Sequence, residues 1–121
     1  MDIYSEIILD HYKNPRNFGT IKKADFENEK SNPLCGDKIK IQISIDKKKI
    51  IKKIVFSGEG CSISQSAASM LTEYLTGKPL STIKKLKRDD MLKMLNIPLS
   101  PAREKCALLA LSTIGDINLT K

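Results

Sequence analysis

Three cysteines and one aspartate are the residues of this 121-residue chain whose types suit metal or sulfur chemistry. They are Cys35, Asp37, Cys61 and Cys106, and no two of the cysteines are close in sequence. If the fold gathers them, three sulfurs and one carboxylate oxygen would form a site for a soft metal or an iron–sulfur cluster. No Cys-x-x-Cys pair is present, so the spacing alone does not establish a zinc site.

Each cysteine has a local setting that suits a metal ligand. Gly36 permits unusual backbone angles, so Cys35 and Asp37 can point the same way. Cys61 directly precedes a predicted helix, where unpaired N–H groups and the helix dipole favour a thiolate. Cys106 lies early in the last predicted helix, close to the basic residues Arg103 and Lys105, which also favour a charged sulfur. The alternative is that the cysteines are core residues, because free cysteine is among the most buried residue types.

Apolar periodicity and end signals predict the helices that must position these residues. The predicted helices are residues 2–13, Ser62 to the stop at Gly77, 80–86, 89–96, and Ser100 onward. Ser62 with Gln65 three residues later is typical of a capping box, and Pro101 occupies the first-turn position of the last helix. Tyr74 and Ala102 are expected on the apolar faces of their helices.

Alternation of isoleucines with polar residues from Ile39 to Ile45 predicts a half-buried strand. Residues 50–56 are expected to pair with it across a turn at 46–49, before a break at 57–60. The polar stretch 20–33 is expected to be a loop with one edge strand. These elements predict an α+β fold, a small antiparallel three-stranded sheet with helices packed on one face.

The length favours a single domain over residues 1–121. No apolar run is long enough to span a membrane, and the N-terminus lacks the layout of a signal peptide. The cytosol is therefore the expected compartment. In the cytosol, an odd number of cysteines favours metal-binding or reactive thiols over disulfides.

The net charge of +7 suggests an acidic partner, with a lysine run at Lys47–Lys49. Nucleic acid is not the expected partner. Only three of the 21 basic residues are arginines, and aromatic residues are 5% of the chain and do not alternate with the basic runs.

Over essentially its whole length the chain resembles the iron–sulfur scaffold family of IscU, SufU and the N-terminal domain of NifU. Four ordered groups of motifs carry the resemblance: Tyr4–Glu6 with Asp10–Gly19, Asn32–Asp37, Phe56–Ser64 with Ala67–Met70, and Pro101–Ala107. The resemblance implies the α+β fold of SufE- and NifU-like proteins. It implies a scaffold, not an enzyme, that receives sulfur from a cysteine desulfurase, builds a 2Fe–2S cluster and transfers it to apo iron–sulfur proteins.

By this resemblance the cluster ligands are Cys35, Asp37, Cys61 and Cys106. Asp37 is the exchangeable ligand, because a carboxylate oxygen holds iron less strongly than a thiolate does. Cys106 is the candidate persulfide acceptor, and Cys35 is the alternative acceptor in the zinc-bearing branch of the family. The resemblance leaves a homodimer open.

Two features depart from the IscU pattern. IscU-type scaffolds carry a histidine before the third cysteine, where this chain has Lys105, and the sole histidine, His11, is expected to be an ordinary helix residue. This ligand set resembles SufU, whereas the 44 residues between Cys61 and Cys106 match the shorter IscU spacing. The motif gripped by heat-shock chaperones is retained only in part at Leu99–Arg103, which argues against a chaperone partner.

Two functions therefore remain as alternatives. The first is the cluster scaffold, and the second is a zinc-dependent sulfur acceptor, a SufU-type sulfurtransferase that serves a desulfurase as its second substrate. A structural zinc domain without sulfur chemistry is disfavoured, because Asp37 is an unusual ligand in closed structural sites.

Overall fold

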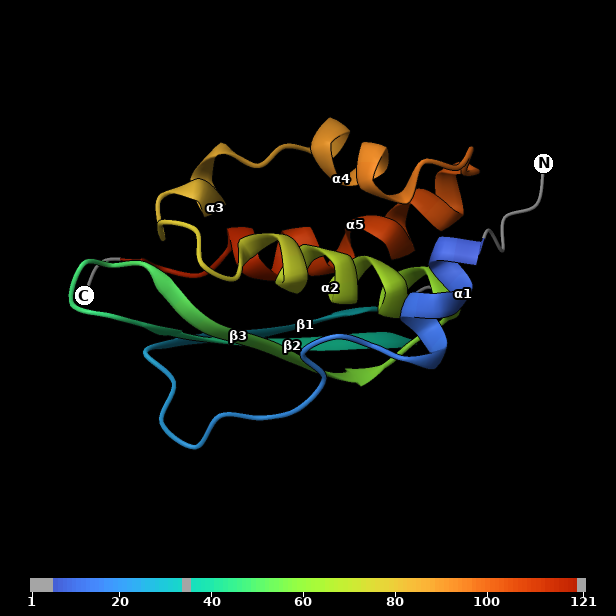
Figure 1. The fold of residues 1–121 in the computed structure, drawn as a ribbon. Helices are drawn as coiled ribbons and strands as arrows, with labels where there is room; N and C mark the ends of the chain where they lie inside the picture. Colours follow the sequence, from blue (N-terminus) through green and yellow to red (C-terminus); the bar gives the residue numbers. More distant parts are fainter. Residues whose placement is uncertain (1–5, 34–35, 120–121) are drawn as a thin grey trace.

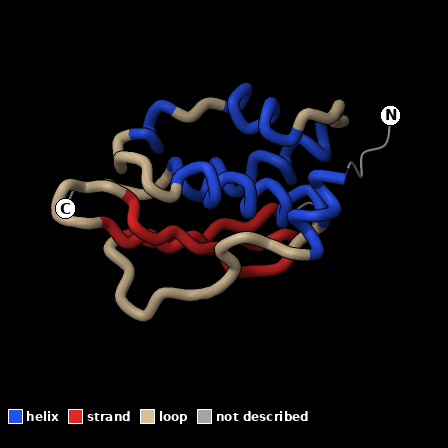
Figure 2. The backbone as a smooth tube through the Cα atoms, in the orientation of Figure 1, coloured by secondary structure: helices blue, strands red, loops and turns tan. Residues whose placement is uncertain are grey.

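The computed structural model describes residues 6–33 and 36–119, which form an antiparallel sheet with helices on one face (Figures 1 and 2). Along the chain the elements are α1 (Glu6–Lys13), β1 (Phe26–Asn32), β2 (Asp37–Ile45), β3 (Ile51–Glu59), α2 (Ser62–Leu75), α3 (Thr82–Lys85), α4 (Arg88–Leu95) and α5 (Pro101–Gly115). The strand order is β1-β2-β3. The predicted α+β class is confirmed. In the described ranges, no helix is both long enough and apolar enough to cross a membrane.

The inner face of the sheet is built from large apolar side chains of β2 and β3. Ile41 pairs with Phe56 and Ile43 with Ile54, and all four side chains are fully buried. A one-residue slip would turn them toward the opposite face, so their burial fixes the register. Helices α2 and α5 lie over this face, and α4 packs on the outside of both (Figure 1).

The segment between α1 and β1 crosses the face of the sheet that the helices leave uncovered (Figure 1). Phe56 in β3 donates its N–H to the Asn17 carbonyl (3.0 Å), and its carbonyl accepts the Gly19 N–H (2.9 Å), so the segment forms an isolated bridge with β3 at this residue. Gln42 in β2 is 5% exposed, and its amide bonds both the N–H and the carbonyl of Ile21. This side chain therefore fixes the crossing segment to the sheet.

Most predicted boundaries agree with the structure. The predicted short helices correspond to α3 and α4, β1 is the predicted edge strand, and α5 begins at Pro101 after the N-cap Ser100. The Ser100 hydroxyl accepts the Arg103 N–H at 3.4 Å. The predicted first helix corresponds to α1, and its residues 2–5 lie outside the described residues.

Three expectations about the fold are wrong. The break expected at 57–60 is limited to Gly60, because β3 continues to Glu59. A side chain at Gly58 would lie 2.0 Å from the Lys38 carbonyl oxygen, so glycine permits the strand pairing. Tyr74 is 41% exposed, with the Lys78 ammonium 4.7 Å from its ring centre, and Ala102 is exposed in the first turn of α5. The third is the capping box at Ser62, because the N-cap of α2 is Cys61 and not Ser62.

Candidate metal and sulfur site

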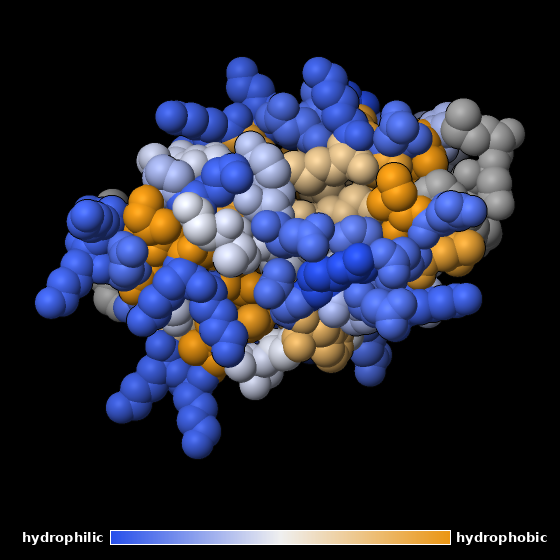
Figure 3. All heavy atoms as spheres, viewed as in Figure 1, coloured by the Kyte–Doolittle hydropathy of each residue, from blue (hydrophilic) through white to orange (hydrophobic). Residues whose placement is uncertain are grey.

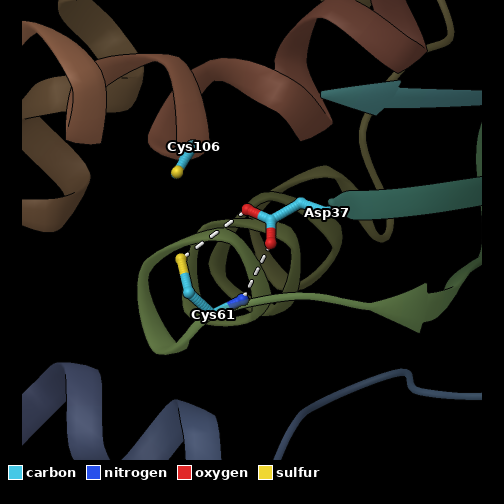
Figure 4. A group of neighbouring side chains, drawn as sticks. All are labelled: Asp37, Cys61 and Cys106. Atoms are coloured by element: carbon cyan, nitrogen blue, oxygen red, sulfur yellow. Dashed lines mark hydrogen bonds between the residues drawn. The ribbon is translucent and has the colours of Figure 1, made fainter. Parts of the chain in front are cut away.

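Three of the four predicted site residues meet at one end of the sheet. Asp37 is the first residue of β2, Cys61 directly precedes α2, and Cys106 lies in the second turn of α5. A carboxylate oxygen and the two sulfurs all lie within 4.8 Å of one another (Figure 4). The fourth predicted residue, Cys35, lies outside the described residues. The structure thus brings together side chains from three elements that are far apart in sequence.

Asp37 is held in place by the start of α2. Its side chain is buried, with 3% exposure, and Oδ1 accepts the backbone N–H of Cys61 at 3.1 Å. The other oxygen, Oδ2, accepts a long hydrogen bond from the Cys61 thiol at 3.7 Å (Figure 4). One carboxylate therefore bonds both the backbone and the sulfur of Cys61.

The start of α2 differs from the predicted capping box. Cys61 itself is the N-cap residue, with extended backbone angles (φ −75°, ψ 173°), and its carbonyl accepts the Gln65 N–H at 3.0 Å. Ser62 is already helical, so it cannot serve as the N-cap. Because β3 runs to Glu59, only Gly60 separates the strand from this N-cap. The short connection thus places the Cys61 sulfur at the end of the sheet.

Gly60 and Ser64 form the tightly packed side of the site. A Cβ atom at Gly60 would lie 2.2 Å from the Ser64 Oγ and 3.2 Å from the Asp37 Cγ. Ser64 is fully buried, donates to the Cys61 carbonyl at 3.1 Å and lies 3.8 Å from the Cys61 sulfur. Ser64 is not among the site residues predicted from the sequence. Its signal was a serine three residues after the cysteine, on the first turn of a buried helix.

The donor atoms fit a thiophilic metal. Zinc bonds of about 2.3 Å to sulfur and about 2.1 Å to oxygen place two ligands of one tetrahedral ion about 3.6 Å apart. The Cys61 Sγ and the Asp37 Oδ2 are 3.7 Å apart. Two sulfurs and one oxygen also suit iron in an iron–sulfur cluster. The Cys61–Asp37 pair therefore has the spacing of two ligands of one ion, and the chemistry of the three donors suits either kind of metal centre.

Neither Lys105 nor His11 belongs to the group of donor atoms formed by Asp37, Cys61 and Cys106. Lys105, which stands where a histidine was expected, is exposed on α5. His11 is 7% exposed, and its Nδ1 lies 2.7 Å from the Ser69 hydroxyl between α1 and α2. Burial lowers the pKa of His11 below its ordinary value of 6.5, and the Arg16 guanidinium lowers it further. His11 thus occupies the structural position expected of it.

Comparisons with known proteins identify relatives over most of the chain. A family model described as the NifU-like N terminal domain matches residues 3–117. The chain is 37% identical over 111 residues to the iron–sulfur cluster assembly scaffold protein IscU of Escherichia coli, covering 88% of this chain and 84% of that protein. It is 34% identical over 125 residues to the zinc-dependent sulfurtransferase SufU of Bacillus subtilis, covering 89% and 84%.

Solved structures give the same result. A SufU protein from Fervidobacterium islandicum, described as an iron–sulfur cluster assembly scaffold for the SUF system, superposes with a TM-score of 0.80 at 29% identity, covering 93% of both chains. The N-terminal part of a NifU-like protein from Brucella abortus has a TM-score of 0.76 at 19% identity, covering 94% of this chain and 90% of that chain, and supports the fold alone. The chain therefore belongs to the NifU-like N-terminal domain family.

Proposed function

We propose that this protein is an iron–sulfur cluster assembly scaffold. It receives sulfur from a cysteine desulfurase, builds a 2Fe–2S cluster with iron, and transfers the cluster to apo-proteins. The observation that carries the proposal is the convergence of Asp37, Cys61 and Cys106 within 4.8 Å, in a chain 37% identical to an IscU scaffold. The cluster is cargo, so the protein acts by binding and release, as one domain over residues 1–121.

Cys35 completes the proposed ligand set with Asp37, Cys61 and Cys106. Asp37 is the ligand best suited to leave, because its oxygen binds iron more weakly than thiolate sulfur does. It also has a partner of its own, since Oδ1 accepts the Cys61 N–H at 3.1 Å. A carboxylate already bonded to the protein keeps that stabilising contact when the metal departs.

Sulfur uptake is assigned to Cys106. Its thiolate attacks the outer sulfur of the persulfide on the desulfurase, so a new S–S bond forms on Cys106 and the enzyme's cysteine leaves as a thiolate. The step is an exchange without net oxidation. Cys35 is the alternative acceptor.

The second candidate function is a zinc-dependent sulfur acceptor. Because Lys105 stands where IscU-type scaffolds have a histidine, the proposed donor set consists of three cysteines and one aspartate. The 34% identical SufU is named a zinc-dependent sulfurtransferase. In this case zinc would hold the site closed until one cysteine leaves to attack the persulfide.

Anaerobic purification followed by incubation with iron and sulfide separates the two candidates. The scaffold gives a brown protein with visible absorption bands. Cys61→Ser loses these bands, whereas the charge-preserving surface control Lys105→Arg retains them. A protein that stays colourless with one tightly bound zinc overturns the scaffold proposal and supports the sulfur acceptor.

A further inference from the structure

The end of the sheet opposite the candidate site is strongly cationic. β2 begins at Asp37 and runs for nine residues, so its far end lies about 26 Å from the site, at about 3.3 Å per residue. Lysines gather there at Lys47–Lys49, Lys52–Lys53 and Lys84–Lys85, and none belongs to an ion pair within the described ranges. In Figure 3 hydrophilic side chains project from this end, where Figure 1 places the β2–β3 turn and α3.

These lysines surround a cavity of about 360 Å³. Its cationic lining residues are Lys48, Lys49 and Lys84, and its apolar lining residues are Pro79, Leu80 and Leu119. A cavity with an apolar floor and a cationic rim differs from a row of solvated lysines, because it can enclose an apolar side chain while binding acidic groups around it.

Backbone hydrogen bonds fix the shape of this cavity. The Leu80 N–H donates to the Lys49 carbonyl and the Ile51 N–H to the Lys78 carbonyl, at 2.8 and 2.9 Å. The carboxylate of Asp46 accepts two N–H groups of its own turn, from Lys48 and Ile50. The turn is thus joined to the α2–α3 connection, and its acidic residue is engaged with the backbone.

We propose that this cavity docks an acidic segment of a partner protein, which inserts one apolar side chain over Leu80 and places carboxylates beside Lys48 and Lys84. The docking site lies on a different end of the molecule from Asp37 and Cys61, so a partner bound there leaves the candidate site accessible. The inference does not rest on the proposed function.

The cavity is less suited to a phosphate or a nucleic acid. The N–H groups of Lys48, Lys49, Leu80 and Lys84 are all donated within the protein, so these backbone donors are not available to cradle a phosphate. Among the residues that the structure describes, no aromatic side chain lines the cavity for base stacking, and its basic rim is lysine without arginine. A carboxylate-bearing segment with an apolar residue satisfies both the rim and the floor.

The test uses the full chain and a fluorescein-labelled peptide of glutamates and serines with one central leucine, measured by fluorescence anisotropy. Lys48→Glu/Lys84→Glu should bind the peptide at least about tenfold more weakly. The matched control Lys13→Glu/Lys93→Glu changes the net charge equally at two exposed lysines on α1 and α4 and should stay within about twofold. Replacing the leucine of the peptide by serine should also weaken binding.

Three outcomes would overturn the proposal. They are equal losses in both double variants, amide chemical shifts that move near Asp37 instead of Leu80, and tighter competition by single-stranded DNA or anionic vesicles than by the peptide. Lys48→Gln/Lys84→Gln serves if charge reversal prevents folding. Chemical cluster assembly should be unchanged in these variants, so a failure here is distinct from a failure of the scaffold proposal.

Discussion

The backbone N–H of Cys61 donates a 3.1 Å hydrogen bond to the carboxylate of Asp37, which joins the start of α2 to the start of β2. A hydrogen bond to a charged group contributes about 1.5–3 kcal/mol to stability. Asp37 therefore has a structural contact as well as its proposed role as a metal ligand. Variants at Asp37 must therefore distinguish the loss of this hydrogen bond from the loss of a metal ligand.

Asp37→Ala should lower the free energy of unfolding by about 1.5–3 kcal/mol, because the Cys61 N–H loses its acceptor. Asp37→Asn keeps an oxygen acceptor and should retain most of that stability. Both variants remove the exchangeable ligand, so both should hold a reconstituted cluster longer and transfer it more slowly to an apo-ferredoxin. Faster transfer from either variant contradicts the role assigned to Asp37.

Cys106→Ser should abolish persulfide transfer from a desulfurase, because a hydroxyl cannot attack the persulfide as a thiolate does. Mass spectrometry of the protein after incubation with a desulfurase and cysteine would detect the added sulfur. Lys105→Arg is the matched control on the same turn: it keeps the positive charge beside the sulfur and should keep sulfur uptake. If uptake is unchanged in Cys106→Ser, the acceptor is Cys35 or Cys61.

Gly60→Ala should destabilise the protein by about 1–3 kcal/mol and weaken metal binding, because its Cβ would lie 2.2 Å from the Ser64 Oγ. Gly115→Ala is the control, since nothing lies within 4 Å of a Cβ there. Adding Ser64→Ala should restore part of the lost stability. Denaturant unfolding and zinc titration measure both effects. Equal unfolding midpoints for Gly60→Ala and Gly115→Ala would show that the close packing around Gly60 does not contribute to the free energy of unfolding.

His11 should make stability depend on pH. Its pKa is lowered in the folded protein, so its contribution to stability is complete above the unfolded-state value of 6.5 and is lost as the pH falls through the folded-state pKa. The Ser69 hydroxyl accepts the Arg16 N–H, which leaves its hydrogen for the His11 Nδ1 of a neutral ring. Urea unfolding at about pH 7.5 and about pH 5 should show that the free energy of unfolding changes less between these pH values in His11→Gln than in the unsubstituted protein. An equal change in both proteins contradicts this origin.

The sheet could be predicted because its pattern is local. Alternating isoleucines from Ile39 to Ile45 determine which face of β2 is buried, and the structure confirms the strand. Pro101 likewise marked the start of α5, since proline suits the first helical turn. The end of β3 was not predictable in this way. Whether Gly58 interrupts a strand or permits one depends on the Lys38 carbonyl beside it, which is a contact between strands.

The site was predictable in its residue types but not in its support. Thiol and carboxylate chemistry together with the family motifs pointed to Asp37, Cys61 and Cys106, and the structure places them together. The Cys61 N–H bond to Asp37 and the packing of Ser64 against Gly60 arise only once β2 and α2 are side by side. Local capping rules therefore predicted Ser62 as the N-cap. In the structure the N-cap is Cys61, and its N–H is bonded by Asp37 of β2.

The convergence of three elements on one site has a topological consequence. An ion bound by Asp37, Cys61 and Cys106 would link positions 24 and 45 residues apart (61 − 37 and 106 − 61), so it would close two loops in the chain. Such cross-links restrict the unfolded ensemble, and a ligand that binds only the folded form stabilises it by an amount that grows with the logarithm of the free ligand concentration relative to Kd. A bound ion would thus cross-link the sheet to α2 and α5, and its release would remove these cross-links.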